Sequence, residues 1–120
     1  MTVQKLEKSE WFPFFEYVSA ALLTGKRAEI EVLSDRLGAQ VEADWTPVFG
    51  IVYDYKDDII DISLENTNHV IQGAREIYID IAAVDDLAQI AVADGNGAWH
   101  HVKIRDPLML PPSVSVRQGD

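Results

Sequence analysis

Three histidines are the side chains of this sequence best suited to proton transfer, and two of them are adjacent. His100 and His101 fall on a predicted strand, so their side chains point to opposite faces and cannot readily bind the same metal ion. His100 is expected on the core side, opposite Val92, where a buried imidazole needs a hydrogen-bond partner. His101 is expected outside, and His69 in a loop.

A histidine beside a carboxylate would supply the acid–base pair of a small hydrolase or lyase. The candidates are His69 or His100 beside Asp80 or Asp61, and the hypothesis requires these groups to converge in one pocket. The sequence contains no serine nucleophile elbow, phosphate loop, dinucleotide glycine pattern or metalloprotease helix, and it has no cysteine. It therefore favours a protein that is not an enzyme, with no assigned catalytic residue and no cofactor; acid–base catalysis is the alternative.

Four aspartates gather near the centre of the chain, at positions 54, 57, 58 and 61. Oxygen-rich loops of this kind can hold calcium or magnesium. The spacing lacks the glycine and the distal glutamate of a calcium loop, and aspartate is common in turns for other reasons. We therefore predict a solvated turn and no metal site.

The row formed by Trp99, His101, Lys103 and Arg105 combines aromatic, imidazole and cationic side chains on one face of a predicted strand. Aromatic and arginine side chains are enriched at interfaces, and the cations could recognise an anionic group or the acidic strands of this chain. The alternative is plain surface, in which the two cations balance nearby carboxylates. We take these four residues as the candidate binding site, for self-association as a homodimer or for an unknown protein partner.

The hairpin that carries this row is restricted by the side-chain period of two. A three-residue loop at 95–97 pairs Ile90 with Val102 and Val92 with His100, which keeps the apolar residues on one face. This loop requires its last glycine, at position 97, to adopt a left-handed conformation.

The stretch 48–65 predicts a second antiparallel hairpin. Residues 48–53 form an apolar run suited to a central strand covered on both faces, and residues 60–65 alternate as a half-buried strand does. Pro47 is expected to break or bend the chain before this hairpin. Residues 66–73 predict a loop or a single helical turn. Further alternating segments are 28–32, 39–45 and 77–81.

The first third of the chain predicts one amphipathic helix that starts after Ser9 as N-cap and stops at Gly25. Its apolar stripe, expected to pack on the sheet of the same chain, is Trp11, Phe14, Phe15, Val18, Ala21 and Leu22. The predicted fold class is α+β: an N-terminal helix packed on a bent antiparallel sheet or partly open barrel of six to seven strands.

Composition limits the function further. A chain of 120 residues with 48% hydrophobic residues suits one globular domain, which we place at 1–112, followed by a frayed tail at 113–120. The net charge of −10 repels phosphate backbones, so nucleic acid is not an expected partner. No apolar run approaches the roughly 20 residues of a membrane span, and the N-terminus lacks a signal-peptide pattern. A cytoplasmic location and no membrane partner are therefore expected.

Four segments also carry a family resemblance: KLEKSEW, RAEIEV, HVIQGAREIYID and IRDPLMLP. Together they resemble an uncharacterised bacterial family of small single-domain proteins, a domain of unknown function. The resemblance covers nearly the whole chain. It implies a bacterial origin, and it brings no activity, cofactor or site residue to carry over.

Overall fold

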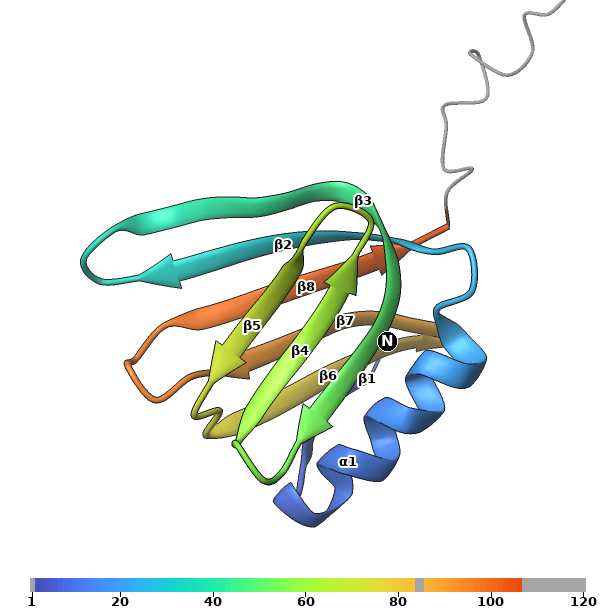
Figure 1. Ribbon diagram of the computed structural model, residues 1–120, viewed down its shortest axis with the longest axis horizontal. Coiled ribbons are helices and arrows are strands. Elements are labelled where there is room, and N and C mark those ends of the chain that lie inside the picture. Colours follow the sequence, from blue (N-terminus) through green and yellow to red (C-terminus); the bar gives the residue numbers. More distant parts are fainter. Residues whose placement is uncertain (1, 84–85, 107–120) are drawn as a thin grey trace, which may run out of the picture.

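The computed structural model describes residues 2–83 and 86–106, which form one helical segment and eight strands (Figure 1). The helix α1 (Lys8–Tyr17) continues into a π-helical turn, η1 (Val18–Leu22). The strands are β1 (Thr2–Leu6), β2 (Arg27–Ser34), β3 (Gly38–Asp54), β4 (Ile59–Leu64), β5 (Asn68–Gln72), β6 (Glu76–Ala83), β7 (Asp86–Ala93) and β8 (Trp99–Arg105). The tail expected at 113–120 lies outside the described residues.

All eight strands belong to one antiparallel sheet in the order β1-β6-β7-β8-β2-β3-β4-β5. The 17-residue strand β3 pairs with β2 through its first half and with β4 through its second half. The sheet folds over along β3, so that β4 and β5 lie in front of β6, β7 and β8 in Figure 1. Within the described residues the end strands β1 and β5 do not pair with each other, so the sheet is open. The predicted helix on a bent antiparallel sheet is confirmed, but the predicted strand number is too low.

The two strands that the sequence did not predict are those at the ends of the sheet. Among the described strands, β1 pairs only with β6 and β5 pairs only with β4; a loop or helical turn was expected in place of β5. End strands are short and pair with a neighbour on one side only, so their apolar residues alternate weakly. Tertiary pairing, rather than local pattern, therefore sets their conformation.

Of the two alternatives at Pro47, a break or a bend, the break is wrong, because β3 runs through this residue and Pro47 is paired in register with Arg27. Irregularities lie on both sides of Pro47: the register with β2 shifts near Ala43, Trp45 has a positive φ of 51°, and the register with β4 shifts between Val48 and Gly50. Local bulges of this kind increase the bend of a strand. A bent continuous strand thus replaces the two separate strands that were predicted.

The helix starts two residues earlier than expected. Glu7 precedes it, and the Glu7 amide donates to Glu10 Oε1 at 2.9 Å, so Ser9 lies inside the helix rather than at its cap. A carboxylate that reaches back to the residue before the helix is half of a capping box and defines the start. The predicted stop is confirmed, since Gly25 has a φ of +74°.

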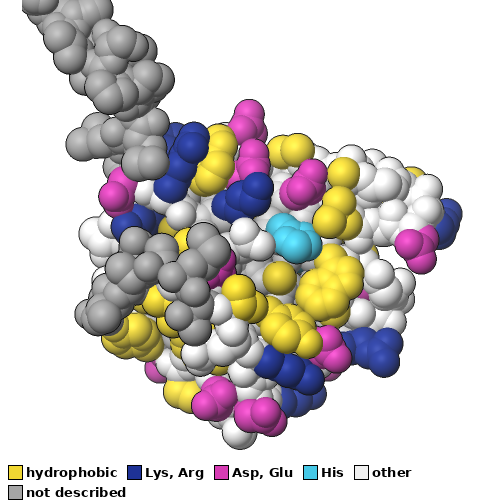
Figure 2. Space-filling model, turned by 180° about the vertical axis from the view of Figure 1, so that it is seen from behind, with side chains coloured by type: hydrophobic (Ala, Val, Ile, Leu, Met, Phe, Trp, Pro, Cys, Tyr) yellow, Lys and Arg dark blue, Asp and Glu magenta, His cyan; other side chains and the backbone are white. Residues whose placement is uncertain are grey.

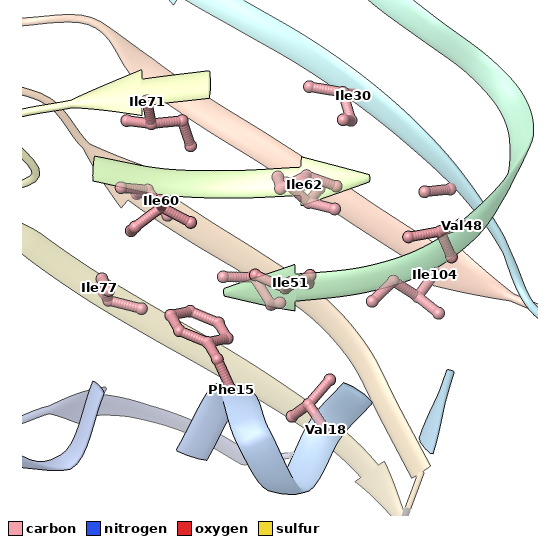
Figure 3. Packing of buried hydrophobic residues seen from close by; sticks show 14 of the residues in the cluster. Phe15, Val18, Ile30, Val48, Ile51, Ile60, Ile62, Ile71, Ile77 and Ile104 are labelled. Carbon is pink, nitrogen blue, oxygen red and sulfur yellow. The ribbon is translucent and has the colours of Figure 1, made fainter. Parts of the chain in front are cut away.

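The core lies between the two layers of the folded sheet, with the helix closing one side (Figure 3). Phe15 and Val18 point from the helical segment towards isoleucines of both layers, among them Ile51 and Ile77. This confirms that the apolar helical stripe packs on the sheet of its own chain, except for Ala21, which is exposed. The expectation that residues 48–53 are covered on both faces is wrong, because Val52 is 54% exposed.

The 95–97 hairpin is confirmed in both register and loop conformation. Ile90 pairs with Val102, Val92 pairs with His100, and Gly97 has a φ of +88°. The loop therefore places each side chain of β8 on the face that the sequence predicted.

Replacement of Gly97 by alanine should destabilise the protein by about 1 kcal/mol, because L-residues avoid the left-handed region. A Cβ at this position would meet no atom within 4 Å, so the loss is conformational and not steric. Urea denaturation measures it. Asparagine at 97 should cost less than alanine, and a neutral Gly97→Ala would contradict the conformational explanation.

Candidate functional site

Asp94, His100 and His69 form a continuous hydrogen-bonded chain, which we call the Asp–His–His relay. His100 Nε2 lies 2.8 Å from Asp94 Oδ2, and His100 Nδ1 lies 2.9 Å from His69 Nε2. The side chains of His100 and Asp94 are only 8% and 13% exposed, while His69 is half-buried. The relay thus runs from the interior of the β7–β8 hairpin to β5, across the space between the two layers.

The β7–β8 hairpin holds the carboxylate end of the relay rigidly. Asp94 Oδ1 accepts hydrogen bonds from the backbone amides of Asn96 at 2.8 Å and Ala98 at 3.0 Å. Its other oxygen faces the imidazole of His100, which projects inward from β8. One carboxylate therefore orders the loop and orients the buried ring together.

Two glycines let the neighbouring loops approach beside the relay. A Cβ built on Gly95 would lie only 3.2 Å from the carbonyl oxygen of Gly73, at the end of β5. This distance is tighter than most real Cβ contacts, so a side chain at position 95 would have to displace the Gly73 carbonyl by a few tenths of an ångström. The close approach brings β5 against the hairpin, and so brings His69 to His100.

The environment keeps Asp94 ionised and His69 neutral over most of the physiological range. Burial by itself would raise the pKa of Asp94, but the hydrogen bonds from His100 and from the Ala98 and Asn96 amides outweigh it, and the pKa is lowered. Burial lowers the pKa of His69 and the neighbouring His100 lowers it further, against a smaller opposing effect of Glu42. The ionised Asp94 accepts, so His100 Nε2 is the donor in that contact.

The two facing imidazole nitrogens, at 2.9 Å, can share one proton but not two. In one arrangement His69 Nε2–H donates to His100, and in the other His100 Nδ1–H donates to His69. A second proton would set two N–H groups against each other. Once the pair has taken up one extra proton, so that His100 Nε2 and His69 Nδ1 both carry hydrogen, that proton can pass between His100 Nδ1 and His69 Nε2.

The carboxylates expected beside the histidines lie elsewhere. Asp61 accepts a 2.7 Å hydrogen bond from Asn68 Nδ2, and Asp80 lies on β6 with its Oδ1 buried and unpartnered among the described residues. Asp94 is the carboxylate that the sequence reasoning missed. The sequence did contain a signal for it: residues 90, 92 and 94 alternate along one strand, so Asp94 falls on the same inner face as Ile90, Val92 and His100.

The aspartates of the β3–β4 turn serve separate local contacts. Asp54 Oδ1 accepts from the amides of Lys56 at 2.9 Å and Asp57 at 3.2 Å, and Asp58 Oδ1 accepts from Tyr53 Oη at 2.8 Å. No group of three or more possible metal ligands comes together in residues 2–83 and 86–106.

The predicted row on β8 lies on the outer face of the sheet, and each of its members has an intramolecular neighbour. The Trp99 ring lies 6.0 Å from that of Tyr78, and Gln89 Nε2 lies 3.3 Å from His101 Nδ1. Lys103 Nζ lies 3.8 Å from Glu29. The remaining member is Arg105, whose guanidinium lies 3.6 Å from the centroid of the Trp45 ring.

The centre of this outer face is apolar where solvent-facing sheets are usually polar. The register aligns Tyr78 with Ala91 and His101, and aligns Ala93 with Trp99 and Leu33. Figure 2 shows this face, with hydrophobic side chains beside a histidine and charges of both signs around them. The helix packs on the opposite, inner side, so no described element covers these residues.

Neither helical segment in the described residues is long and apolar enough to cross a membrane.

No solved structure matches the chain significantly. It is 30% identical over 112 residues to an uncharacterized protein of the bacterium Aquifex aeolicus (strain VF5), covering 92% of this chain and 99% of that protein. Residues 2–113 match the model of a family of unknown function, DUF5335. With a match of this extent, the chain belongs to the DUF5335 family.

Proposed function

We propose that this protein is a small interaction module that self-associates as a homodimer through the outer face of β1, β6, β7, β8 and β2. The observation that carries the proposal is the apolar centre of that face, made by Tyr78, Ala91, Ala93, Trp99 and Leu33. Exposed apolar patches with a polar rim mark interaction sites in soluble proteins.

The charges around this centre favour a second copy as the occupant. One cross-strand row runs Lys5, Tyr78, Ala91, His101, Glu31, so a cation lies at one end and an anion at the other. A two-fold axis close to β7 and parallel to it would turn this row end for end. It would bring Lys5 of one copy near Glu31 of the other, twice in each dimer.

A second row gives the same result. It runs Val3, Asp80, Gln89, Lys103, Glu29, and the same rotation brings Asp80 near Lys103 of the second copy. The unpartnered buried Oδ1 of Asp80 would then gain a cation nearby. Two independent rows that are complementary about one axis support a symmetric dimer despite the net charge of −10 on each chain.

Sedimentation equilibrium over a concentration series tests the proposal, and a dimer is expected. Ala91 lies near the proposed axis, so Ala91→Glu would place two carboxylates against each other and should raise the dimer dissociation constant at least about 100-fold. Val70→Glu is the matched control on β5, because Val70 is 44% exposed on the other side of the molecule. A wild-type monomer at every concentration would contradict the proposal.

A charge exchange tests the orientation of the two copies. Lys5→Glu should weaken the dimer by roughly tenfold or more, and adding Glu31→Lys should restore it. If the double variant were as weak as the two single variants combined, the dimer would have to use another axis.

A second candidate function, acid–base catalysis at His69, is favoured by the relay. When His69 Nε2–H donates to His100, His69 Nδ1 is left with a lone pair at the more exposed end. Hydrolysis of p-nitrophenyl acetate by the wild type should then fall in His69→Ala. The control is His101→Ala on the outer face, and equal rates for the two variants would remove this candidate.

A further inference from the structure

A cavity of about 550 Å³ lies between the start of α1 and the β3–β4 turn, and neither the dimer face nor the relay includes it. Its lining is Lys8, Ser9, Phe12, Tyr53, Tyr55 and Asp58. A second cavity, of about 370 Å³, adjoins it along the helix and shares Phe12 and Tyr53. Together they form a groove between α1 and β3.

Aromatic rings dominate one side of the larger cavity. The lining rings of Phe12 and Tyr55 meet edge to face, with centroids 5.5 Å apart. The lining ring of Tyr53 packs edge to face, at 5.2 Å, on the buried ring of Trp11, which does not line the cavity. Tyr55 is 64% exposed and Phe12 is 37% exposed, although both are large aromatic side chains. Aromatic faces attract cations through the quadrupole of the ring.

A carboxylate completes the other side. Asp58 lines the cavity, and its Oδ1 accepts the hydroxyl hydrogen of Tyr53 at 2.8 Å. Asp58 also has a positive φ of 55°, a conformation that costs free energy for a residue other than glycine. Burial, together with the hydrogen bond and charge of Asp58 and the charge of Asp54, raises the pKa of Tyr53 to about 12. The carboxylate charges of Asp58 and Asp54 disfavour a further negative charge here and favour a positive one, whereas burial disfavours a charge of either sign.

An ammonium group of the chain already lies at this site. Lys8 Nζ is 5.5 Å from the centroid of the Trp11 ring and 3.9 Å from Asp58 Oδ1. The Lys8 side chain is 64% exposed, so it is held loosely and can move away. The lysine thus marks the position that a cation prefers, without closing the cavity.

We propose that this cavity binds an alkylated ammonium group, held between the aromatic rings of Phe12, Tyr53 and Tyr55 and the carboxylate of Asp58. Lys8 occupies part of the site when no ligand is bound and competes with it. A free quaternary amine and a methylated lysine carry the same chemistry, and either would fit these contacts. The net charge of −10 would attract such cations to the protein.

Titration with choline, followed through the amide resonances of Phe12 and Tyr55, tests the proposal. Saturable shifts with a millimolar dissociation constant are expected. The neutral isostere 3,3-dimethylbutan-1-ol has the same shape without the charge and should bind at least about tenfold more weakly. Equal binding of the two compounds, or no saturable shift with choline, would overturn the proposal. Free trimethyl-lysine is titrated in parallel, and tighter binding than choline would identify the amino-acid form as the better ligand.

Three variants locate the contacts. Asp58→Asn keeps a residue type that tolerates positive φ and should weaken choline binding about tenfold. Asp57→Asn removes the same charge from the exposed neighbouring residue and should change binding less than about twofold. Lys8→Ala should strengthen binding about threefold, because it removes the internal competitor. Equal losses in the two aspartate variants, or weaker binding in Lys8→Ala, would contradict the proposed site.

Discussion

Asp94→Ala is expected to destabilise the protein by about 3 kcal/mol and to lower its Tm by about 12 °C. The change removes the acceptor of two backbone amides, those of Asn96 and Ala98, in the hairpin loop. It also leaves His100, whose side chain is 8% exposed, without its carboxylate partner. An unsatisfied buried polar group costs more than the net gain of an ordinary hydrogen bond. Thermal and urea denaturation measure the effect.

Asp54→Ala provides a matched control for this prediction. Asp54 Oδ1 also accepts from two loop amides, those of Lys56 and Asp57, but its hairpin has no buried histidine. We expect a loss of about 1 kcal/mol for this variant. The difference between the two variants measures the contribution of the Asp94–His100 contact, and equal losses would show that this contact adds nothing to stability.

Acidification should destabilise the wild type as the pH falls below about 6.5, the ordinary pKa of histidine. The pKa of His69 is lowered in the folded state, mainly by burial and then by His100, so the unfolded chain binds more protons in this window. Stability then rises with pH across the window, is complete above about pH 6.5 and is lost as the pH falls through the folded-state pKa. The structural event is protonation of His69 at its free Nδ1, which places a positive charge on a half-buried ring beside His100.

His69→Gln should remove this part of the pH dependence, because an amide can donate to His100 without taking up a proton. His101→Gln makes the same change on the outer face and should leave the acid-induced fall unchanged. The measurement is Tm at a series of pH values between about 7.5 and 5. A fall of the same size in His69→Gln would place its origin in other groups. At still lower pH, the lowered pKa of Asp94 predicts a further loss, since that carboxylate stabilises the fold only while it is ionised.

The local sequence pattern was sufficient to predict the β7–β8 hairpin. The glycine at 97 and the alternation from Ile90 to Ile104 determine the hairpin register, and both are visible in the sequence. The second half of β3 shows the limit of such patterns. An apolar run suggested burial on both faces, but only one face of this part of β3 is covered, and Val52 lies on the other, which faces solvent. Which side of a strand is covered depends on how the sheet folds, and that is a property of the whole chain.

In the candidate site, too, local pattern predicts some positions and the fold of the whole chain decides the others. The sequence placed His100 inward and His101 outward, because neighbours on a strand alternate. It could not place His69, which reaches His100 only because β5 folds over β8. Because residues 66–73 were predicted as a loop, no side-chain direction could be assigned to His69, and its contact with His100 could not be predicted. A correct assignment of β5 as an end strand would have put His69 and Ile71 on the inner side together.

The position of β8 in the sheet has a consequence for how the protein is made. β8 is the last described strand along the chain, yet it lies between β7 and β2 and, among the described strands, provides the pairing that joins β1-β6-β7 to β2-β3-β4-β5. Until Trp99–Arg105 has been synthesised, the growing chain exposes an unpaired edge on β7 and another on β2. Open edges of this kind recruit other chains. We therefore expect the sheet to assemble only after β8 has been synthesised, and fragments that end before Trp99 to accumulate in inclusion bodies rather than as a smaller folded domain.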